Sequence, residues 1–132
     1  MKEGSVLDVM SKIVSFVGNC ENGLYVPLTV FILIDYITGV CLAIKRKRLS
    51  SKIGFNGIVR KILMYVVAVL GRVIDRFILS STTPVESMIL LFYISNEGIS
   101  ILENLTKLDV PFPARIKQVF TEIIKDSEQE NN

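Results

Sequence analysis

The feature that most constrains this chain is an apolar run at residues 24–44, LYVPLTVFILIDYITGVCLAI, which contains one charged residue. An α-helix rises about 1.5 Å per residue, so a run of this length crosses the roughly 30 Å hydrocarbon core of a bilayer. Pro27 falls in the first turn of the expected helix, where a missing amide proton costs little. We therefore expect residues 24–44 to span a membrane.

Two further segments are also predicted to span. Residues 58–79 hold an uninterrupted apolar run from Ile62 to Gly71, and residues 86–106 follow the helix-breaking sequence SSTTP. Half of all residues are apolar and the mean hydropathy is +0.48, which is unusual for a water-soluble domain. The expected fold class is all-α: a single integral membrane domain over residues 1–132 with three transmembrane helices.

Both ends of the chain are predicted to form amphipathic helices. In residues 1–23, Ser5 and Asp8 resemble a capping box. In residues 107–132, an interfacial helix is expected after Pro111 and Pro113, followed by a disordered polar end, DSEQENN. The apolar positions at helical spacing are Val6, Met10, Ile13 and Val17 in the first segment, and Ile116, Val119, Phe120, Ile123 and Ile124 in the second.

The connector after the first span predicts the orientation. We expect a loop at 45–57, because residues 45–61 carry seven basic residues and no acidic one, and short loops of this kind stay in the cytoplasm and contact anionic lipid. Three spans then place the N-terminus outside and the C-terminus inside, whereas an interfacial second segment would place the C-terminus outside. The basic residues are Lys45, Arg46, Lys47, Arg48, Lys52, Arg60 and Lys61.

Composition excludes several kinds of site. The chain has no His and two Cys, so it cannot assemble a usual zinc site, a Ser-His-Asp triad or a histidine general base. Cys20 and Cys41 are expected to be free thiols. The GFNG sequence lacks the surroundings of a nucleic-acid or phosphate-binding loop, and the N-terminus lacks the pattern of a cleavable secretory signal. We expect neither enzymatic activity nor a cofactor, a metal or a nucleic-acid partner.

The third predicted span carries a polar stripe. Its members recur at helical offsets, while Leu91, Ile94, Ile101 and Leu105 fall on the opposite side. The stripe either lines and gates a water-filled pore or holds helices together by hydrogen bonds. Its members are Tyr93, Asn96, Glu97, Ser100, Glu103, Asn104 and Lys107.

The other two predicted spans also hold ionisable groups, each of which costs about 2.5 to 3.5 kcal/mol at the centre of a membrane helix. Asp35, Thr38 and Gly39 share one helical face of the first span. Arg72 and Asp75 lie three residues apart in the second, on a face that also holds Tyr65 and Ala68. We expect Arg72 to pair with Asp75, and also with Asp35 or Glu97 of a neighbouring helix, within one chain or between chains.

Taken together and in order, these motifs resemble the toxin-secretion and phage-lysis holin family. The resemblance runs from about residue 30 to Pro113, although the family pattern usually places a Gly at the position of Asp109. The matching residues are Asp35, Thr38 and Gly39; Ser50, Ser51, Gly54, Gly57, Arg60 and Lys61; Asp75; Tyr93, Asn96, Glu97, Ser100, Glu103 and Asn104; and Val110 to Pro113.

The resemblance implies a small membrane protein of phage or prophage origin. Such a protein accumulates in the bacterial cytoplasmic membrane, forms homo-oligomers and opens lesions that release an endolysin or, in some relatives, a toxin. Three other classes stay open: an antiholin or accessory subunit, a small proton-coupled exporter, and a soluble helical bundle. An exporter usually has a fourth span and aromatic residues around its carboxylate, whereas a soluble bundle would be recovered without detergent.

Overall fold

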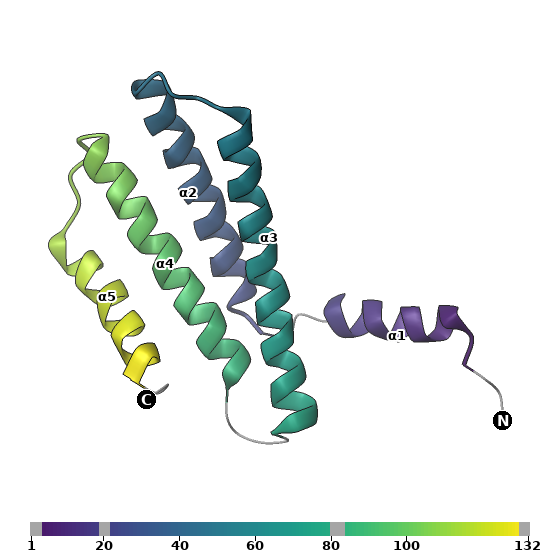
Figure 1. Cartoon of the computed structure of the whole chain (residues 1–132). Helices are drawn as coiled ribbons and strands as arrows, with labels where there is room; N and C mark the ends of the chain where they lie inside the picture. Colours follow the sequence, from purple (N-terminus) through teal and green to yellow (C-terminus); the bar gives the residue numbers. More distant parts are fainter. Residues whose placement is uncertain (1–3, 19–21, 80–83, 130–132) are drawn as a thin grey trace.

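The structure is a computed structural model that describes residues 4–18, 22–79 and 84–129. These residues form helices and no strands, which confirms the all-α prediction for them (Figure 1). Cys20 and the end of the predicted tail lie outside the described residues. The elements are α1 (Val6–Gly18), α2 (Tyr25–Lys45), α3 (Ser51–Val73), the π-helical turn η1 (Ile74–Ile78), α4 (Val85–Lys107) and α5 (Ala114–Gln129).

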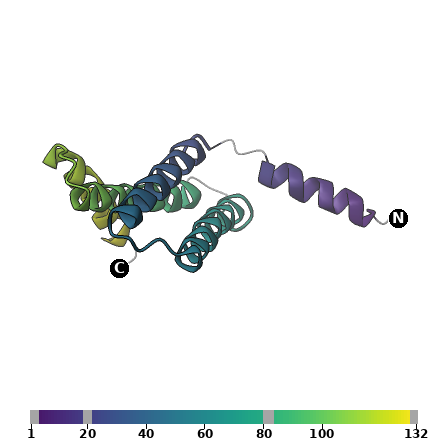
Figure 2. The ribbon, with the colours of Figure 1, turned by 90° about the horizontal axis from the view of Figure 1, so that it is seen from above.

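Helix α4 lies at the centre of the molecule and packs against α2, α3 and α5. Figure 2 shows α5 and α1 at opposite sides of the bundle, with α1 extending away from the other helices. Leu28, Ala68 and Leu90 are fully buried where α2, α3 and α4 meet. Close contact between apolar side chains joins these three helices. The core consists of Tyr25, Leu28, Met64, Ala68, Leu90 and Ile94.

Two of the three predicted spans are long and apolar enough to cross a membrane. They are α2 and α4, whose bounds lie within one residue of the predicted 24–44 and 86–106. Helix α3 does not meet the same criterion within the described residues. Its four basic residues reduce its apolar character, so the structure supports two candidate spans rather than three.

The predicted loop at 45–57 is wrong in its second half, because α3 already begins at Ser51. The prediction rested on the basic residues, which a helix also accommodates, and Gly54 and Gly57 lie inside α3 at a cost of only about 1 kcal/mol each relative to alanine. The backbone N–H of Gly54 donates to the Ser50 carbonyl at 3.1 Å, within the first helical turn. The basic connector is therefore shorter than predicted, and Lys52, Arg60 and Lys61 lie on a helix.

The two terminal helices follow the predicted amphipathic spacing, with one correction. At the start of α1, the Asp8 backbone N–H donates to Ser5 Oγ at 3.3 Å, as a capping residue requires. At the other end, α5 continues to Gln129, so the predicted disordered tail is helical up to that residue. Its glutamate and glutamine residues are favourable helix formers.

A tight turn reverses the chain between α4 and α5. Asp109 adopts the left-handed conformation, with φ of 62°, which explains why a glycine suits this position. Lys45 Nζ lies 2.8 Å from Asp109 Oδ2 and also donates to the Lys107 carbonyl at 3.3 Å. The hydrogen bond and charge of Lys45 lower the pKa of Asp109. The turn directs α5 back along α4, so α5 does not continue away from the bundle.

We expect Asp109→Val to destabilise the turn and Asp109→Gly to be tolerated. A β-branched residue in the left-handed region costs about 1–2 kcal/mol, whereas glycine adopts it without steric cost. Thermal unfolding of the purified protein in detergent micelles measures both variants. Lys45→Met is the control that removes the ion pair alone. Equal losses from Asp109→Gly and Asp109→Val would contradict a conformational role for this position.

Candidate functional site

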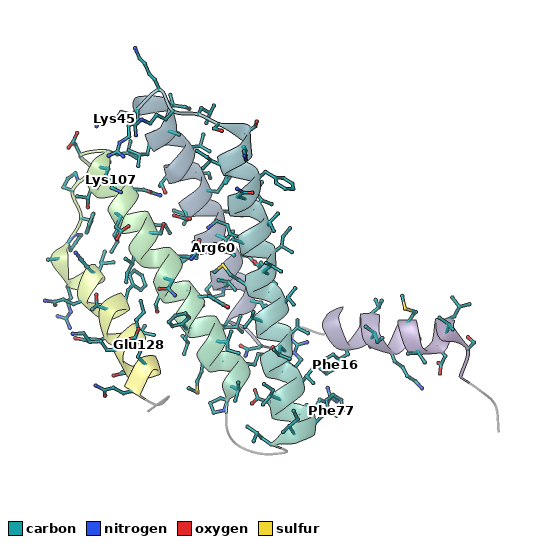
Figure 3. All side chains as sticks on the ribbon, in the orientation of Figure 1. Phe16, Lys45, Arg60, Phe77, Lys107 and Glu128 are labelled. Carbon is teal, nitrogen blue, oxygen red and sulfur yellow. The ribbon has the colours of Figure 1, made fainter. Side chains whose placement is uncertain are left out.

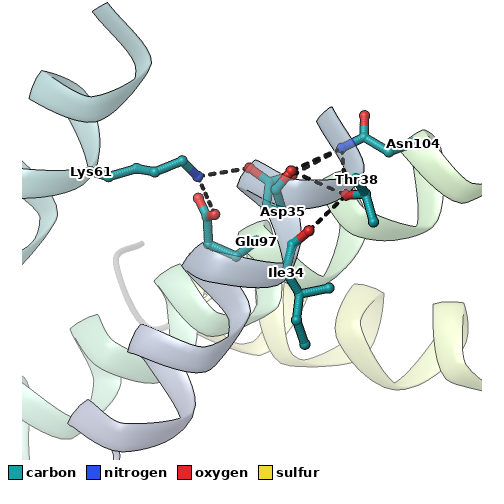
Figure 4. Close-up of polar contacts among 6 residues, drawn as sticks. All are labelled: Ile34, Asp35, Thr38, Lys61, Glu97 and Asn104. Carbon is teal, nitrogen blue, oxygen red and sulfur yellow. Dashed lines mark hydrogen bonds and ion pairs between the residues drawn. The ribbon is translucent and has the colours of Figure 1, made fainter. Parts of the chain in front are cut away.

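Five polar side chains from three helices meet near the middle of the bundle, and we call them the buried polar cluster (Figure 4). Lys61 of α3 lies between two carboxylates. Its Nζ donates to Asp35 Oδ2 of α2 at 2.7 Å and to the Glu97 carboxylate of α4. The three side chains are 17%, 13% and 10% exposed, respectively, so the ion pairs are shielded from solvent. The members are Asp35, Thr38, Lys61, Glu97 and Asn104.

The amide of Asn104 completes the cluster from α4. Its Nδ2 donates to Asp35 Oδ1 at 3.2 Å and to Thr38 Oγ1 at 3.1 Å. The Thr38 hydroxyl donates in turn to the Ile34 carbonyl at 2.9 Å. A Cβ at Gly39 would lie 3.8 Å from Asn104 Nδ2, so this part of α2 approaches α4 closely. Each helix therefore contributes a hydrogen-bonding partner to the others.

The chemistry of the cluster favours holding helices together. Two carboxylates and one ammonium group give a formal charge of −1 when all three are ionised. Ion pairs that are excluded from water need good geometry and extra hydrogen bonds to offset their desolvation, and Asn104 supplies such bonds to Asp35. In the part of the chain that the structure describes, no group of three or more His, Cys, Asp and Glu side chains could hold a metal ion.

A second cluster joins α1, α2, α3 and α4 at the other end of the bundle. Arg72 Nε lies 2.9 Å from Glu86 Oε1, and Arg72 Nη1 donates to the Phe16 carbonyl at 2.8 Å. The Tyr25 hydroxyl donates to the same Glu86 oxygen at 2.6 Å. The guanidinium lies 5.6 Å from the ring centre of Phe16 and 5.4 Å from that of Tyr25, within the range of cation–π contacts.

Asp75 has a different partner from the one predicted. Its two carboxylate oxygens accept the backbone N–H groups of Val85 and Glu86, each at 2.9 Å. These groups lie in the first turn of α4, where backbone donors have no partner within the helix. Asp75 therefore caps α4 from a neighbouring element, and its negative charge is favourable at a helix N-terminus.

Within one chain, Arg72 does not pair with Asp35 or Glu97, and a pairing between chains stays a prediction. Arg72 follows Lys61 by three helical turns on α3, about 16 Å along the axis, so it lies beside Glu86 instead. Lys61, predicted to belong to the basic connector, is the cation that pairs with both carboxylates. Lys61 lies four residues before Tyr65, on the same helical face as Tyr65, Ala68 and Arg72, so extending that face by one turn predicts it.

The residues of the polar stripe of α4 differ in their burial and in their contacts. Glu97 and Asn104 point into the buried polar cluster, whereas Glu103 is exposed. Tyr93, Asn96 and Ser100 are half-buried, and Lys107 is exposed. Ile94 and Ile101, expected on the side away from the stripe, are also buried, because α4 has neighbours on several sides.

The connector residues Arg46, Lys47, Arg48, Lys52 and Arg60 are exposed, and so is Cys41, which is a free thiol.

The two ends of the bundle differ in character. Lys45 and Lys107 lie at one end, near the basic connector, and Phe16 and Phe77 lie at the other (Figure 3). The two phenylalanine ring centres are 5.9 Å apart. The charge distribution is the one from which a cytoplasmic connector was predicted, and the orientation itself stays a prediction.

Helices α3 and α4 approach each other closely at Gly71, a residue that the sequence analysis did not select. A Cβ there would lie 2.7 Å from Ile89 Cδ1 and 3.1 Å from Glu86 Cα. We expect Gly71→Ala to lower the free energy of unfolding by about 1–3 kcal/mol, because the helices must separate. Gly57→Ala is the matched control, since a Cβ at Gly57 meets nothing within 4 Å. Chemical unfolding in detergent measures both, and equal stability of the two variants would contradict the expected clash.

Comparisons with known proteins give consistent matches. The model of the bacteriophage holin family matches residues 11–125. A protein of Bacillus phage phi105 named probable holin is 40% identical over 97 residues, covering 74% of this chain and 71% of that protein. An uncharacterised protein of Clostridium perfringens is 44% identical over 98 residues, 74% of each chain. An uncharacterised protein of Bacillus subtilis is 39% identical over 105 residues, covering 80% of this chain and 74% of that protein. No solved structure matches.

Proposed function

Because this chain belongs to the bacteriophage holin family, we propose that it assembles in the bacterial cytoplasmic membrane and opens lesions that release a muralytic enzyme. Its partners in this proposal are membrane lipids, further copies of the same chain, and an endolysin or exported toxin. No covalent chemistry is required, because the lesion only has to let a folded protein pass.

One structural observation carries the proposal: an ion cluster is enclosed between α2, α3 and α4, while large apolar side chains are exposed on the outer sides of α2 and α3. Lys61 pairs with both Asp35 and Glu97 between the helices. Large apolar side chains point outward along α2 and α3, including Leu33 and Val66, which are each 56% exposed. A surface of this kind is stable against lipid and unstable in water.

The basic connector favours an orientation with residues 45–52 in the cytoplasm, by the preference of Lys and Arg for that side. The N-terminal segment then lies outside. Helix α3 would have to cross the membrane between α2 and α4, and the pairing of Lys61 would reduce the cost of this crossing. Crossings by α2, α3 and α4 are part of the proposal.

The experiment is induced expression in a bacterium with and without a cytoplasmic muralytic enzyme. Optical density and membrane potential are followed together. We expect abrupt depolarisation after a delay in both strains, and lysis only where the enzyme is present. The enzyme expressed alone is the control for leakage.

Other outcomes would contradict the proposal. Accumulation in the membrane without depolarisation would favour an antiholin or a transporter, and co-expression with a functional holin would then show whether the chain delays lysis. Recovery in the soluble fraction without detergent would contradict the membrane location itself.

A further inference from the structure

Helix α5 lies at the same depth as the middle of the candidate spans. The ring of Phe120 covers Gly98, near the midpoint of α4, where an added Cβ would come within 2.7 Å of it. The same ring meets Phe31 of α2 edge-on, with centres 5.8 Å apart and planes at 87°. Figure 1 shows α5 running back along α4. If α2 and α4 cross a bilayer, α5 therefore lies within its thickness.

Helix α5 is attached to α4 by a specific contact. Gly98 leaves just enough room for the Phe120 ring, and a larger residue would displace it. The turn before α5 is held by the ion pair of Lys45 with Asp109. Glu128, near the end of α5, lies towards the end of the bundle opposite Lys45 and Lys107 (Figure 3). The length of α5, about 24 Å from its 16 residues, approaches the hydrocarbon thickness.

The outward face of α5 cannot lie against lipid. On the side away from Phe120 it exposes Gln118, Glu122 and Lys125. The whole helix carries three basic and three acidic residues. Ionisable groups at membrane depth face protein or a water-filled space, because hydrocarbon offers them no partners. This polar face contrasts with the apolar outer faces of α2 and α3.

We propose that α5 forms the water-facing wall of the lesion, with its Gln118, Glu122 and Lys125 face lining the aqueous path while α2 and α3 face the lipid. This inference rests on the proposed function. It assigns the lining to α5 rather than to the polar stripe of α4, where Glu97 and Asn104 already bind α2 and α3. The equal numbers of basic and acidic residues on α5 present no net charge to a passing protein.

The test uses the full-length protein reconstituted in vesicles of phosphatidylethanolamine and phosphatidylglycerol that hold a trapped protein. Single cysteines are placed at Gln118 or Lys125 on α5, and at Leu33 or Val66 as controls. All four positions are exposed in the single chain, Leu33 and Val66 at 56% each, so burial within the monomer does not explain slow labelling of the controls.

The labelling background carries Cys20→Ser and Cys41→Ser, and it must release the trapped protein as the parent does. A charged, membrane-impermeant thiol reagent is added after release. We expect the α5 positions to react at least tenfold faster than the controls on α2 and α3. Equal or slower labelling of the α5 positions overturns the proposal. If the parent protein releases nothing, the proposed function fails, and this inference fails with it.

A second variant tests whether α5 stays on α4. Gly98→Leu displaces Phe120, so we expect at least tenfold slower release, and combining it with Phe120→Ala should restore release by making room. Gly57→Leu, at a position where an added Cβ meets nothing within 4 Å, should behave as the parent. Unchanged or earlier release by Gly98→Leu overturns the proposal, because α5 would then be a cover that leaves α4 before the lesion opens. Failure of Phe120→Ala to rescue a correctly inserted variant also counts against it.

Discussion

Lys61→Met is expected to lower the free energy of unfolding in detergent by about 3–5 kcal/mol, because it leaves two buried carboxylates without their cation. Methionine keeps much of the length of the side chain, so the loss of charge is isolated from a loss of volume. Chemical unfolding followed by circular dichroism measures the change. Lys52→Met is the matched control: the same substitution on the same helix, at an exposed position, should change stability by less than about 1 kcal/mol.

The loss should be reversed by neutralising the partners. Lys61→Met combined with Asp35→Asn and Glu97→Gln removes all three charges and keeps groups that can form hydrogen bonds. Replacing a whole buried ion cluster is often neutral in stability, so we expect most of the loss to be recovered. If the triple variant were less stable than Lys61→Met alone, the ion pairs could not be the origin of the effect.

Arg72→Met is expected to cost a similar 3–5 kcal/mol, since it leaves the Glu86 carboxylate buried without its ion pair. It also removes the donor to the Phe16 carbonyl, so α1 should lose its attachment to α3. Thermal unfolding measures the first effect, and faster proteolysis within residues 4–18 measures the second. Arg76→Met is the matched control, because Arg76 is exposed and contacts the Phe16 ring at 5.7 Å.

The Arg72 prediction has its own compensating variant. Adding Glu86→Gln to Arg72→Met removes the isolated charge, and the Tyr25 hydroxyl can still donate to the remaining amide oxygen. Stability should recover, while the attachment of α1 should not, because the Phe16 carbonyl still lacks its donor. Recovery of both would contradict the direct bond between Arg72 and α1.

Much of the secondary structure could be predicted from local pattern. The apolar runs located α2 and α4 to within one residue, and the spacing of Val6, Met10 and Ile13 indicated α1. The start of α3 was predicted incorrectly. A run of basic residues indicated a connector as far as residue 57, but basic residues are compatible with a helix, and residues 51–57 belong to α3.

The sequence predicted which acidic residues of the candidate site need a cation, but it did not identify the cation that pairs with them. Asp35 and Glu97 were expected to need a cation, because ionisable groups in apolar helices require compensation. Which cation meets them depends on the rotation and axial offset of α3 against α2 and α4. Lys61 and Arg72 lie on the same side of one helix, so the sequence alone does not decide between them, whereas the packing places them at different ends of the bundle.

By itself the sequence determined the class of protein, the extent of α2 and α4, and the need for charge compensation, because these follow from composition and from the 3.6-residue period of one helix. Only the tertiary structure decided that Lys61 joins Asp35 and Glu97, that Asp75 caps α4, and that α5 folds back over Gly98. The physical reason is that helix contacts depend on close packing between segments far apart in the chain, and the period of a single helix carries no information about the register of its neighbours.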